Sequence, residues 1–586
     1  MEEKWFLTTK KADFNGIGKR FGIDPVVARI IRNRDIVSEE DIRQFLEGDL
    51  SDIPDSKLFA DMDKAIDVFQ CHRDEKIRII GDYDIDGVCS TYILVRGLRE
   101  LRCQVDAAIP HRIQDGYGLN DRLIDEAHDD GVSMIITCDN GISAKEQIAH
   151  AKKLGMTVIV TDHHEVPYEE KEGIKSQLLP PADAVVDPKR DDCQYPNSGI
   201  CGGFVAFHFI RALYERLEYD NQELMGEFAE IAAFATVGDV MQLKGENRIL
   251  VKEGLSRMKR SANLGLRSLI KVCELSGKDI TAYHLGFIIG PCLNATGRLD
   301  SAQRALELLM SDSENEAMHI AIELKSMNDS RKDLTAKGVD EAMKAMENWD
   351  LDRKPVIVLY LPSVHESLAG IIAGRVREVY NHPTFILTDG EDGIKGSGRS
   401  VEGYDMFEEL TQVKEYLTKF GGHTLAAGLS LDKAKLDDFI NAINEKCNVD
   451  KEAYIKKVHI DVNMPLSYVT ESLVNQLGIL EPFGMGNPKP IFAQSNLSVT
   501  GVSCIGNTNR VMKLKVHGED GREFVLTLFS GHEVFDEYII AKYSKEELEQ
   551  LYTGNATNVA LSVLYYPDIN EYKGRRSIQF VVQGYK

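Results

Sequence analysis

The chain has 586 residues, of which 43% are hydrophobic and 28% are charged, and its formal net charge is −24 at pH 7. This length exceeds a single hydrophobic core, so we expect about three or four domains of ordinary globular composition. No uninterrupted apolar run could cross a bilayer, and residues 1–14 resemble neither a signal nor a transit peptide, so we expect neither a membrane-spanning nor an exported protein.

The cysteines and the acidic charge narrow the class of protein further. The 10 cysteines are scattered without CxxC spacing, so we expect reduced thiols in a cytoplasmic protein. The negative charge does not exclude a nucleic acid partner, because phosphate binding depends on the local field of a cleft and not on the global balance.

The N-terminal half is predicted to contain a helical extension followed by an α/β domain. Residues 1–54 form the extension, with helix-forming segments such as VVARIIRNR and EEDIRQFLEG. Residues 55–310 alternate short β-branched runs with amphipathic segments, which is typical of a mainly parallel sheet. The strand-like runs are KIRII (76–80), MIIT (134–137) and MTVIV (156–160).

Acidic residues and histidines follow the apolar runs of this domain. The motifs are GDYDIDG (81–87), TCDNGIS (137–143), TDHHE (161–165) and, after a helical segment, TVGDV (236–240). Groups just past the carboxyl ends of parallel strands converge on one crevice. We therefore expect a cluster made of Asp82, Asp84, Asp86, Asp139, His163, His164 and Asp239.

The residue types of this cluster point to a divalent cation. Crowded carboxylates repel one another unless a cation lies between them. Carboxylate and imidazole ligands suit Mn²⁺ or Mg²⁺ better than structural zinc, and two such ions about 3.5–4 Å apart can activate water and stabilise the leaving oxygen of a phosphodiester. A single Asp-Tyr-Asp is usually a solvated turn, but solvated turns have no reason to recur at successive strand ends.

Three further segments complete the predicted organisation. Residues 311–350 are predicted to form a long linking helix, and residues 351–450 a second α/β domain that contains KGSGRS (395–400) and KFGGHTLAAGLSL (419–431). Residues 455–586 carry short strands separated by turn signals, which favours a small OB-like β-barrel. Such a barrel suits nucleic acid, and its candidate contacts are Phe483, Phe492, Arg510, Lys513, Lys515, Lys573, Arg575 and Arg576.

The motifs DYDIDG, CDNG, DHHE and GDV, in this order and together with GSGRS and FGGHTLAAG, resemble the DHH phosphoesterase superfamily. Within it the chain is most similar to the RecJ family of bacterial single-strand-specific 5′→3′ DNA exonucleases. The resemblance covers residues 55–450 strongly and implies the DHH domain, the linking helix, the DHH-associated domain and the terminal barrel. One departure is Ile80, where many relatives have a histidine.

The resemblance implies roles for individual residues. Metal ligands fall on Asp84, Asp86, Asp139, His163 and Asp239, and catalytic roles on Asp82, Asp139 and His164. Contacts to the 5′ phosphate and the strand fall on Arg112, Asn294, Arg298, Ser397, Arg399, Gly422 and His423. Arginine suits phosphate because it can donate two parallel hydrogen bonds. The alternative roles are purely structural: Arg298 would form an ion pair at a helix start, and the glycines before His423 would form a helix C-cap.

The expected function is a Mn²⁺- or Mg²⁺-dependent exonuclease that releases 5′ mononucleotides from single-stranded DNA in repair and recombination. The resemblance implies a monomer that works near the bacterial nucleoid with a RecQ-type helicase and a single-strand-binding protein. One alternative is a DHH phosphodiesterase or pyrophosphatase for small phosphate substrates, which would not need the barrel. Another is an inactive replication scaffold, which would show gaps among the metal ligands.

Overall fold

The structure of the chain is a computed structural model. It describes residues 3–112, 115–116, 118–171, 173–299, 302–390, 393–505, 511–518, 520–529, 531–555, 557–572 and 574–586. Contacts divide the chain into two compact units, one of residues 49–456 and one of residues 3–48 with residues 457–586. Among the described residues, no helix is both long and apolar enough to cross a membrane.

The first α/β domain is built on a five-stranded sheet in which every neighbouring pair is parallel. The strands, in spatial order, are β3 (Val105–Ala108), β2 (Ile77–Ile80), β4 (Met134–Cys138), β5 (Thr157–Thr161) and β8 (Ala184–Val186). The chain leaves β2 first toward β3 and then crosses back to β4. The strand order therefore reverses at β2 and β4, where open α/β sheets form their ligand crevice.

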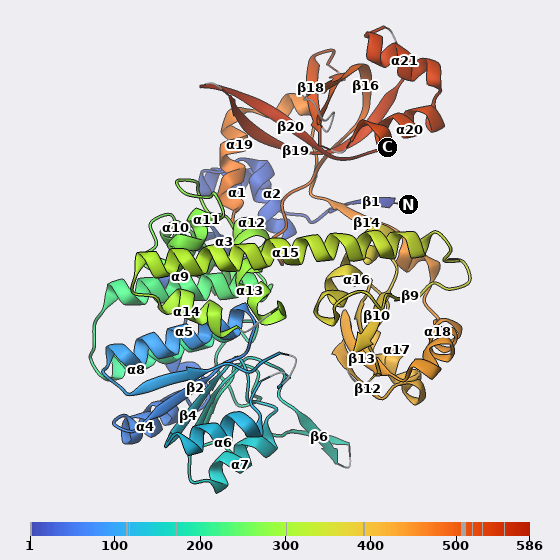
Figure 1. Cartoon of the computed structure of the whole chain (residues 1–586). Helices are drawn as coiled ribbons and strands as arrows, with labels where there is room; N and C mark the ends of the chain where they lie inside the picture. Colours follow the sequence, from blue (N-terminus) through green and yellow to red (C-terminus); the bar gives the residue numbers. More distant parts are fainter. Residues whose placement is uncertain are drawn as a thin grey trace. The chain divides into compact units, whose positions relative to one another are not determined.

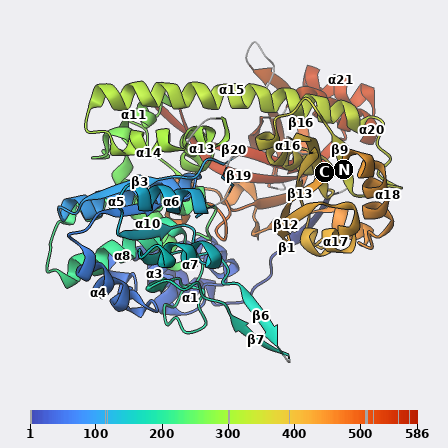
Figure 2. The same cartoon turned by 60° about the horizontal axis from the view of Figure 1, so that its bottom comes forward.

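Helices cover both faces of this sheet (Figure 1). The helices on one face are α5 (Ile85–Glu100), α8 (Gly202–Arg216) and α9 (Gln222–Gly238), and those on the other are α6 (Asp121–Asp129) and α7 (Lys145–Lys153). Alternate strand residues serve the two faces, as Ile79 packs in the first cluster and Ile80 in the second. A hairpin of β6 (Tyr168–Lys171) and β7 (Ile174–Gln177) projects from the domain (Figure 2).

Further helices complete the domain and lead out of it. They are α4 (Met62–His72), α10 (Gly245–Met258), α11 (Leu264–Val272), α12 (Ala282–His284), the π-helical turn η3 (Leu285–Ile289), α13 (Gly290–Leu299) and α14 (Gln303–Met310). The predicted linking helix is α15 (Glu314–Met346), whose 33 residues span about 50 Å.

The second α/β domain has a mixed five-stranded sheet with the order β12-β13-β11-β10-β9. The strands are β9 (Ile357–Tyr360), β10 (Thr384–Gly390), β11 (Gly393–Arg399), β12 (Lys419–His423) and β13 (Ala426–Leu431), and the helices are α16 (Glu366–Tyr380), α17 (Met406–Gln412) and α18 (Leu436–Glu445). Only the β9–β10 pair is parallel. The motifs KGSGRS and KFGGH lie on β11 and β12, the two neighbours of β13.

The C-terminal strands close into a barrel, as predicted for an OB-like fold. They are β16 (Phe492–Ile505), β17 (Val511–His517), β18 (Glu523–Leu528), β19 (Ala560–Tyr572) and β20 (Arg575–Tyr585), with α20 (His532–Lys542) and α21 (Lys545–Thr553) between β18 and β19. Each strand pairs with the next in the order β16-β17-β18-β20-β19, and β19 pairs back with β16. Short elements precede them: β14 (Lys456–Ile460), β15 (Val462–Asn463) and α19 (Glu471–Leu477).

The N-terminal segment packs with this barrel in one unit. Its elements are β1 (Glu3–Leu7), α1 (Phe14–Phe21), α2 (Pro25–Asn33) and α3 (Glu39–Glu47). Strand β1 pairs with β14, and Arg34 forms a buried ion pair of 2.6 Å with Asp461. The sequence predicted only helices here, because a strand whose partner lies about 450 residues away has no local signal.

One predicted barrel contact is wrong. Phe492 is fully buried in the barrel core, so its ring cannot stack on a base. Lys513 donates a hydrogen bond of 2.5 Å to Thr527, and Arg576 forms an ion pair of 3.2 Å with Glu471. Arg510 and Lys573 lie outside the described residues.

Candidate metal centre

The first motif folds into the turn between β2 and α5. Asp84 is the N-cap of α5, and its Oδ1 accepts hydrogen bonds from the backbone N–H groups of Asp86 (2.9 Å) and Gly87 (3.1 Å). Asp82 accepts a hydrogen bond of 3.2 Å from Gly118 N–H. Gly87 must be glycine, because a Cβ there would lie 2.4 Å from the carbonyl oxygen of Asp82. The turn therefore holds three carboxylates at one strand end.

Asp86 is held by the N-terminus of α8. Its two carboxylate oxygens accept hydrogen bonds of 2.7 Å from the N–H groups of Gly202 and Gly203. A helix N-terminus favours an anion, because its N–H groups are free and its dipole is positive there. A Cβ on Gly202 would lie 2.8 Å from the Cβ of Asp139, so the two glycines also allow the helix to approach the cluster.

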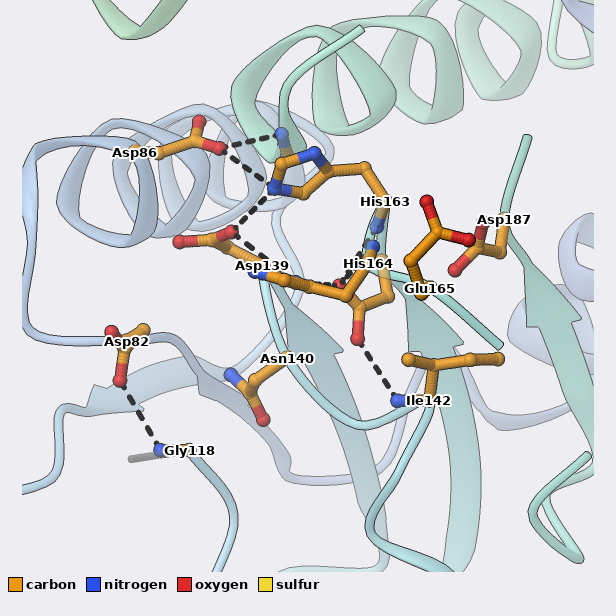
Figure 3. A network of polar contacts seen from close by, with 12 residues as sticks. Asp82, Asp86, Gly118, Asp139, Asn140, Ile142, His163, His164, Glu165 and Asp187 are labelled. Carbon is orange, nitrogen blue, oxygen red and sulfur yellow. Dashed lines mark hydrogen bonds and ion pairs between the residues drawn. The ribbon is translucent and has the colours of Figure 1, made fainter. Parts of the chain in front are cut away.

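His163 brings the other motifs together. Its Nε2 lies 3.0 Å from Asp139 Oδ1, 3.4 Å from Asp86 Oδ2 and 3.8 Å from Asp239 Oδ2. Figure 3 shows the imidazole pointing between Asp86 and Asp139. Burial lowers the pKa of His163, so the ring is neutral at pH 7 and offers a lone pair. One nitrogen thus meets carboxylates that come from α5, from the end of β4 and from the end of α9.

The cluster fits a divalent cation. Three sets have ligand atoms within 4.8 Å of one another: Asp139, His163 and His164; Asp86, His163 and Asp239; and Asp82, Asp84 and Asp139. Among the described residues, the buried Oδ2 atoms of Asp82 and Asp239 accept no hydrogen bond. Oxygens of this kind are costly to bury unless a cation satisfies them.

The acidity of the carboxyl groups supports the same conclusion. Burial, followed by repulsion from Asp84, raises the pKa of Asp82 to about 8. Burial and the charges of Asp86 and Asp84 raise the pKa of Asp239 to about 8, and burial and neighbouring carboxylates also raise the pKa values of Asp84 and Asp139. A cation would remove the repulsion and displace these protons.

His164 differs from its neighbour. Burial lowers its pKa, but the hydrogen bond of 2.7 Å from Nδ1 to Asp162 and the negative charges of Asp162, Asp239 and Asp86 together outweigh burial and raise the pKa to about 9. Asp162 also accepts a hydrogen bond of 2.9 Å from Ile142 N–H, which fixes its carboxylate. The side chain of His164 is 44% exposed. At neutral pH it is therefore an accessible cation beside the cluster.

Sequence reasoning missed several residues that shape the site. The sequence motifs predicted no role for Asp162, Gly202 or Gly203. Asp187 follows β8 directly, and burial, followed by the charge of Asp162, raises its pKa to about 8. The rule that found Asp139, an acidic residue after an apolar run, would also have found Asp187. Ile80, the departure from the family pattern, is fully buried in the aliphatic cluster beside α6 and α7.

The predicted phosphate contacts of the first domain lie close to the first motif. Asn294 Oδ1 accepts a hydrogen bond of 3.0 Å from Ile85 N–H, in the first turn of α5. The guanidinium of Arg112 lies 4.9 Å from the centre of the Tyr83 ring. The side chain of Arg298 lies outside the described residues.

Of the predicted contacts of the second domain, Ser397, Arg399 and His423 share one face of its sheet. Arg399 and His423 are both paired with Ala426, from opposite sides, so their side chains point the same way. Arg399 donates hydrogen bonds to Ser397 Oγ (3.1 Å) and Gly398 O (2.7 Å). Gly422 has a φ of 151°, and a Cβ there would lie 2.4 Å from the carbonyl oxygen of Ala426.

Comparison with protein families assigns all three domains. The DHH family N-terminal domain matches residues 76–236, the DHHA1 domain residues 353–449 and the RecJ OB domain residues 460–584. The single-stranded-DNA-specific exonuclease RecJ of Bacillus subtilis is 33% identical over 590 residues, which cover 99% of this chain and 70% of that protein. The RecJ of Escherichia coli K12 is 30% identical over 582 residues, which cover 96% and 95% of the two chains.

Solved structures agree. RecJ of Thermus thermophilus in complex with Mn²⁺ matches with a TM-score of 0.80 at 26% identity, over 100% of this chain and 80% of that one. The same protein in complex with Mg²⁺ matches with a TM-score of 0.75 at 25% identity, over 100% and 78%.

Proposed function

The chain belongs to the RecJ family of single-stranded-DNA-specific exonucleases, and from this premise we propose that it removes mononucleotides from the 5′ end of single-stranded DNA in repair and recombination. The observation that carries the proposal is the convergence of Asp86, Asp139 and Asp239 on His163 Nε2 at the crevice of the parallel sheet. The match to the RecJ OB domain supports a long strand as the substrate, since small phosphate compounds need no such barrel.

Mn²⁺ or Mg²⁺ is the cofactor that the site and the metal-bound relatives support. We propose that two ions are held by Asp84, Asp86, Asp139, His163 and Asp239. Bound there, such ions lower the pKa of water and neutralise charge on the phosphodiester.

The protein groups around the ions then have separate tasks. His164, cationic and aimed by Asp162, donates a hydrogen bond to a phosphate oxygen of the scissile bond. Asp82, whose Oδ2 accepts no hydrogen bond from the described residues, takes up the proton that the attacking water loses. The bond from phosphorus to the 3′ oxygen of the released nucleotide breaks, and that oxygen takes a proton from solvent. Asp139 and Asp86 stay fixed. The backbone of Asp139 is bonded to Thr161 at the end of β5, and the carboxylate of Asp86 accepts hydrogen bonds from the N-terminus of α8. The chemistry needs no covalent intermediate.

The strand itself is bound by groups on both domains of the larger unit. We propose that Arg112 and Arg298 on the first domain and Ser397 and Arg399 on the second contact the 5′ phosphate, with Asn294 donating its amide hydrogens. Gly422 contacts the strand through its backbone, and His423 contacts a phosphate or a base. The support is the shared orientation of Arg399 and His423 and the closeness of Asn294 and Arg112 to the first motif.

The cellular setting follows from the family resemblance alone. We propose that the protein acts as a monomer in the bacterial cytoplasm, on strands that a RecQ-type helicase unwinds and a single-strand-binding protein covers. Sedimentation of the purified chain and degradation of duplex DNA with and without the helicase test these points.

The first experiment is degradation of a 3′-labelled single strand that carries a 5′ phosphate or a 5′ hydroxyl, in Mn²⁺ or in EDTA. Wild type and Asp139→Ala are compared. We expect metal-dependent release of mononucleotides from the 5′ end, faster with the phosphate and absent in the variant. Activity on pyrophosphate or dinucleotides but not on long strands would contradict the proposal.

A further inference from the structure

One helical segment runs along the edge of the metal centre. It consists of α12, η3 and α13, residues 282–299. A Cβ on Gly286 would lie 3.8 Å from Val237, one on Gly290 would lie 3.1 Å from Ile85, and one on Gly297 would lie 2.6 Å from the carbonyl oxygen of Tyr83. Val237 precedes Asp239 by two residues, and Ile85 and Tyr83 alternate with the three aspartates of the first motif. The start of the segment therefore lies at the Asp239 end of the crevice.

Two aromatic side chains are exposed at that start. Tyr283 is 62% exposed and Phe287 is 65% exposed. Their ring centres are 5.1 Å apart and the rings are inclined by 26°, so they stack on each other. The opposite face of the same turns is buried through Ala282, Leu285 and Ile289. The fold is thus anchored without the two rings.

The local backbone is also unusual. Residues Leu285–Ile289 form a π-helical turn, with the N–H of Gly290 bonded to the carbonyl of Leu285. Such turns are rare and occur often at functional sites. At the adjoining end of α9, Val240 has a φ of 59° and is 62% exposed, a conformation that is strained for a β-branched residue. Neither the exposed rings nor the two backbone features are explained by packing of the core.

We propose that Tyr283 and Phe287 form a stacking platform for unpaired bases of the strand on the Asp239 side of the metal centre, an inference that rests on the proposed function. Arg112, the predicted phosphate contact, lies over Tyr83 at the opposite end of the segment. A strand whose 5′ end is held there and whose scissile bond meets the cluster continues past Asp239 onto the two rings. Aromatic rings bind bases of any sequence, and a duplex, whose bases are already stacked, offers them no face. The platform would therefore favour single strands.

The test is binding of single-stranded 20-mers that carry 2-aminopurine at one defined position, in EDTA so that no cleavage occurs. The fluorescence of 2-aminopurine falls when the base stacks. We expect quenching by the full-length wild type at a limited set of positions, and its loss in Tyr283→Ala/Phe287→Ala with affinity about 5- to 100-fold weaker. Tyr283→Phe/Phe287→Trp, which keeps both rings, restores quenching and affinity.

Tyr168→Ala is the matched control, since Tyr168 is 57% exposed on the projecting hairpin and has no place in the platform. With Mn²⁺ present, the double alanine variant should raise KM for the 20-mer far more than it lowers kcat. Unchanged quenching and KM in that variant would overturn the platform, and so would a defect confined to stimulation by a partner protein. If the protein cleaves no strand but quenching still depends on the two rings, the stacking platform would be upheld and the proposed exonuclease function would be rejected.

Discussion

The acidic crevice of the first domain and the glycine-rich sheet face of the second domain differ in how far their side chains are buried and held in place. In the crevice Asp139 and His163 are buried, and Asp86, Asp84 and Asp82 are each held by backbone N–H groups. On the sheet face His423 is exposed, and the exposed pair of Gly421 on β12 and Gly428 on β13 adds no side chain to the surface.

Under the proposed function, the two regions have different physical tasks. Charge stabilisation at a reacting phosphate needs groups that do not reorganise during the reaction, and backbone hydrogen bonds supply that rigidity. Binding a sugar–phosphate chain needs room for close approach, which glycine provides by lacking a side chain. Damage to the crevice should therefore lower kcat, and damage to the sheet face should mainly raise KM.

The largest effect is expected from Asp139→Asn. The change removes a carboxylate that belongs to two of the three ligand sets. Because a metal ion contributes several kcal/mol to stabilisation of the transition state, we expect kcat to fall by about 1000-fold or more. Steady-state kinetics in Mn²⁺ measure it. Asp129→Asn, on the exposed end of α6, is the control, and a loss below about tenfold for Asp139→Asn would remove that residue from the centre.

Gly202→Ala should have a smaller effect on the same region. The added Cβ would collide with Asp139 and shift the N–H groups that donate hydrogen bonds to Asp86. We therefore expect Mn²⁺ affinity and kcat to fall by about 10- to 100-fold. Calorimetric titration with Mn²⁺ and kinetics provide the readout. The matched control is Gly374→Ala in α16, where a Cβ would meet no atom within 4 Å. Wild-type behaviour of Gly202→Ala would show that this helix end tolerates displacement.

Arg399→Ala tests the other region. The loss of a charged hydrogen-bond donor should raise KM by about tenfold or more for a 5′-phosphorylated strand, with a smaller change for a 5′-hydroxyl strand and little change in kcat. Arg375→Ala, an exposed arginine on α16, is the comparison. An equal effect on both kinds of 5′ end would place Arg399 away from the terminal phosphate.

The smallest expected effect is on stability. Asp82 and Asp239 have folded-state pKa values of about 8, above the 3.8 of the unfolded chain, so the metal-free folded state binds more protons between pH 4 and pH 8. Its stability should therefore fall as pH rises through this window, by a few degrees in Tm, and Mn²⁺ should restore it most strongly near pH 8. Thermal melts with and without Mn²⁺ check this, and a Tm independent of pH in EDTA would contradict it.

Much of the crevice was predictable because its signals are local. The aspartates of 81–87, Asp139 and His163 each follow a short β-branched run, and parallel strands bring their carboxyl ends to one edge. Phe492 was mispredicted as a base contact, since an aromatic residue on a barrel strand faces the core or the solvent according to a register that composition does not reveal.

By itself the sequence determined the order of the motifs, the parallel α/β plan of the first domain, the barrel and the ligand chemistry of the metal centre, because each depends on residue types at fixed local spacing. Only the tertiary structure decided which backbone groups hold those ligands. Gly202 reaches Asp86 across 116 residues, Asn294 reaches Ile85 across 209, and the N-terminal segment joins the barrel through Arg34 and Asp461, 427 residues apart. Contacts at such separations arise from packing of the whole chain, so no local pattern encodes them.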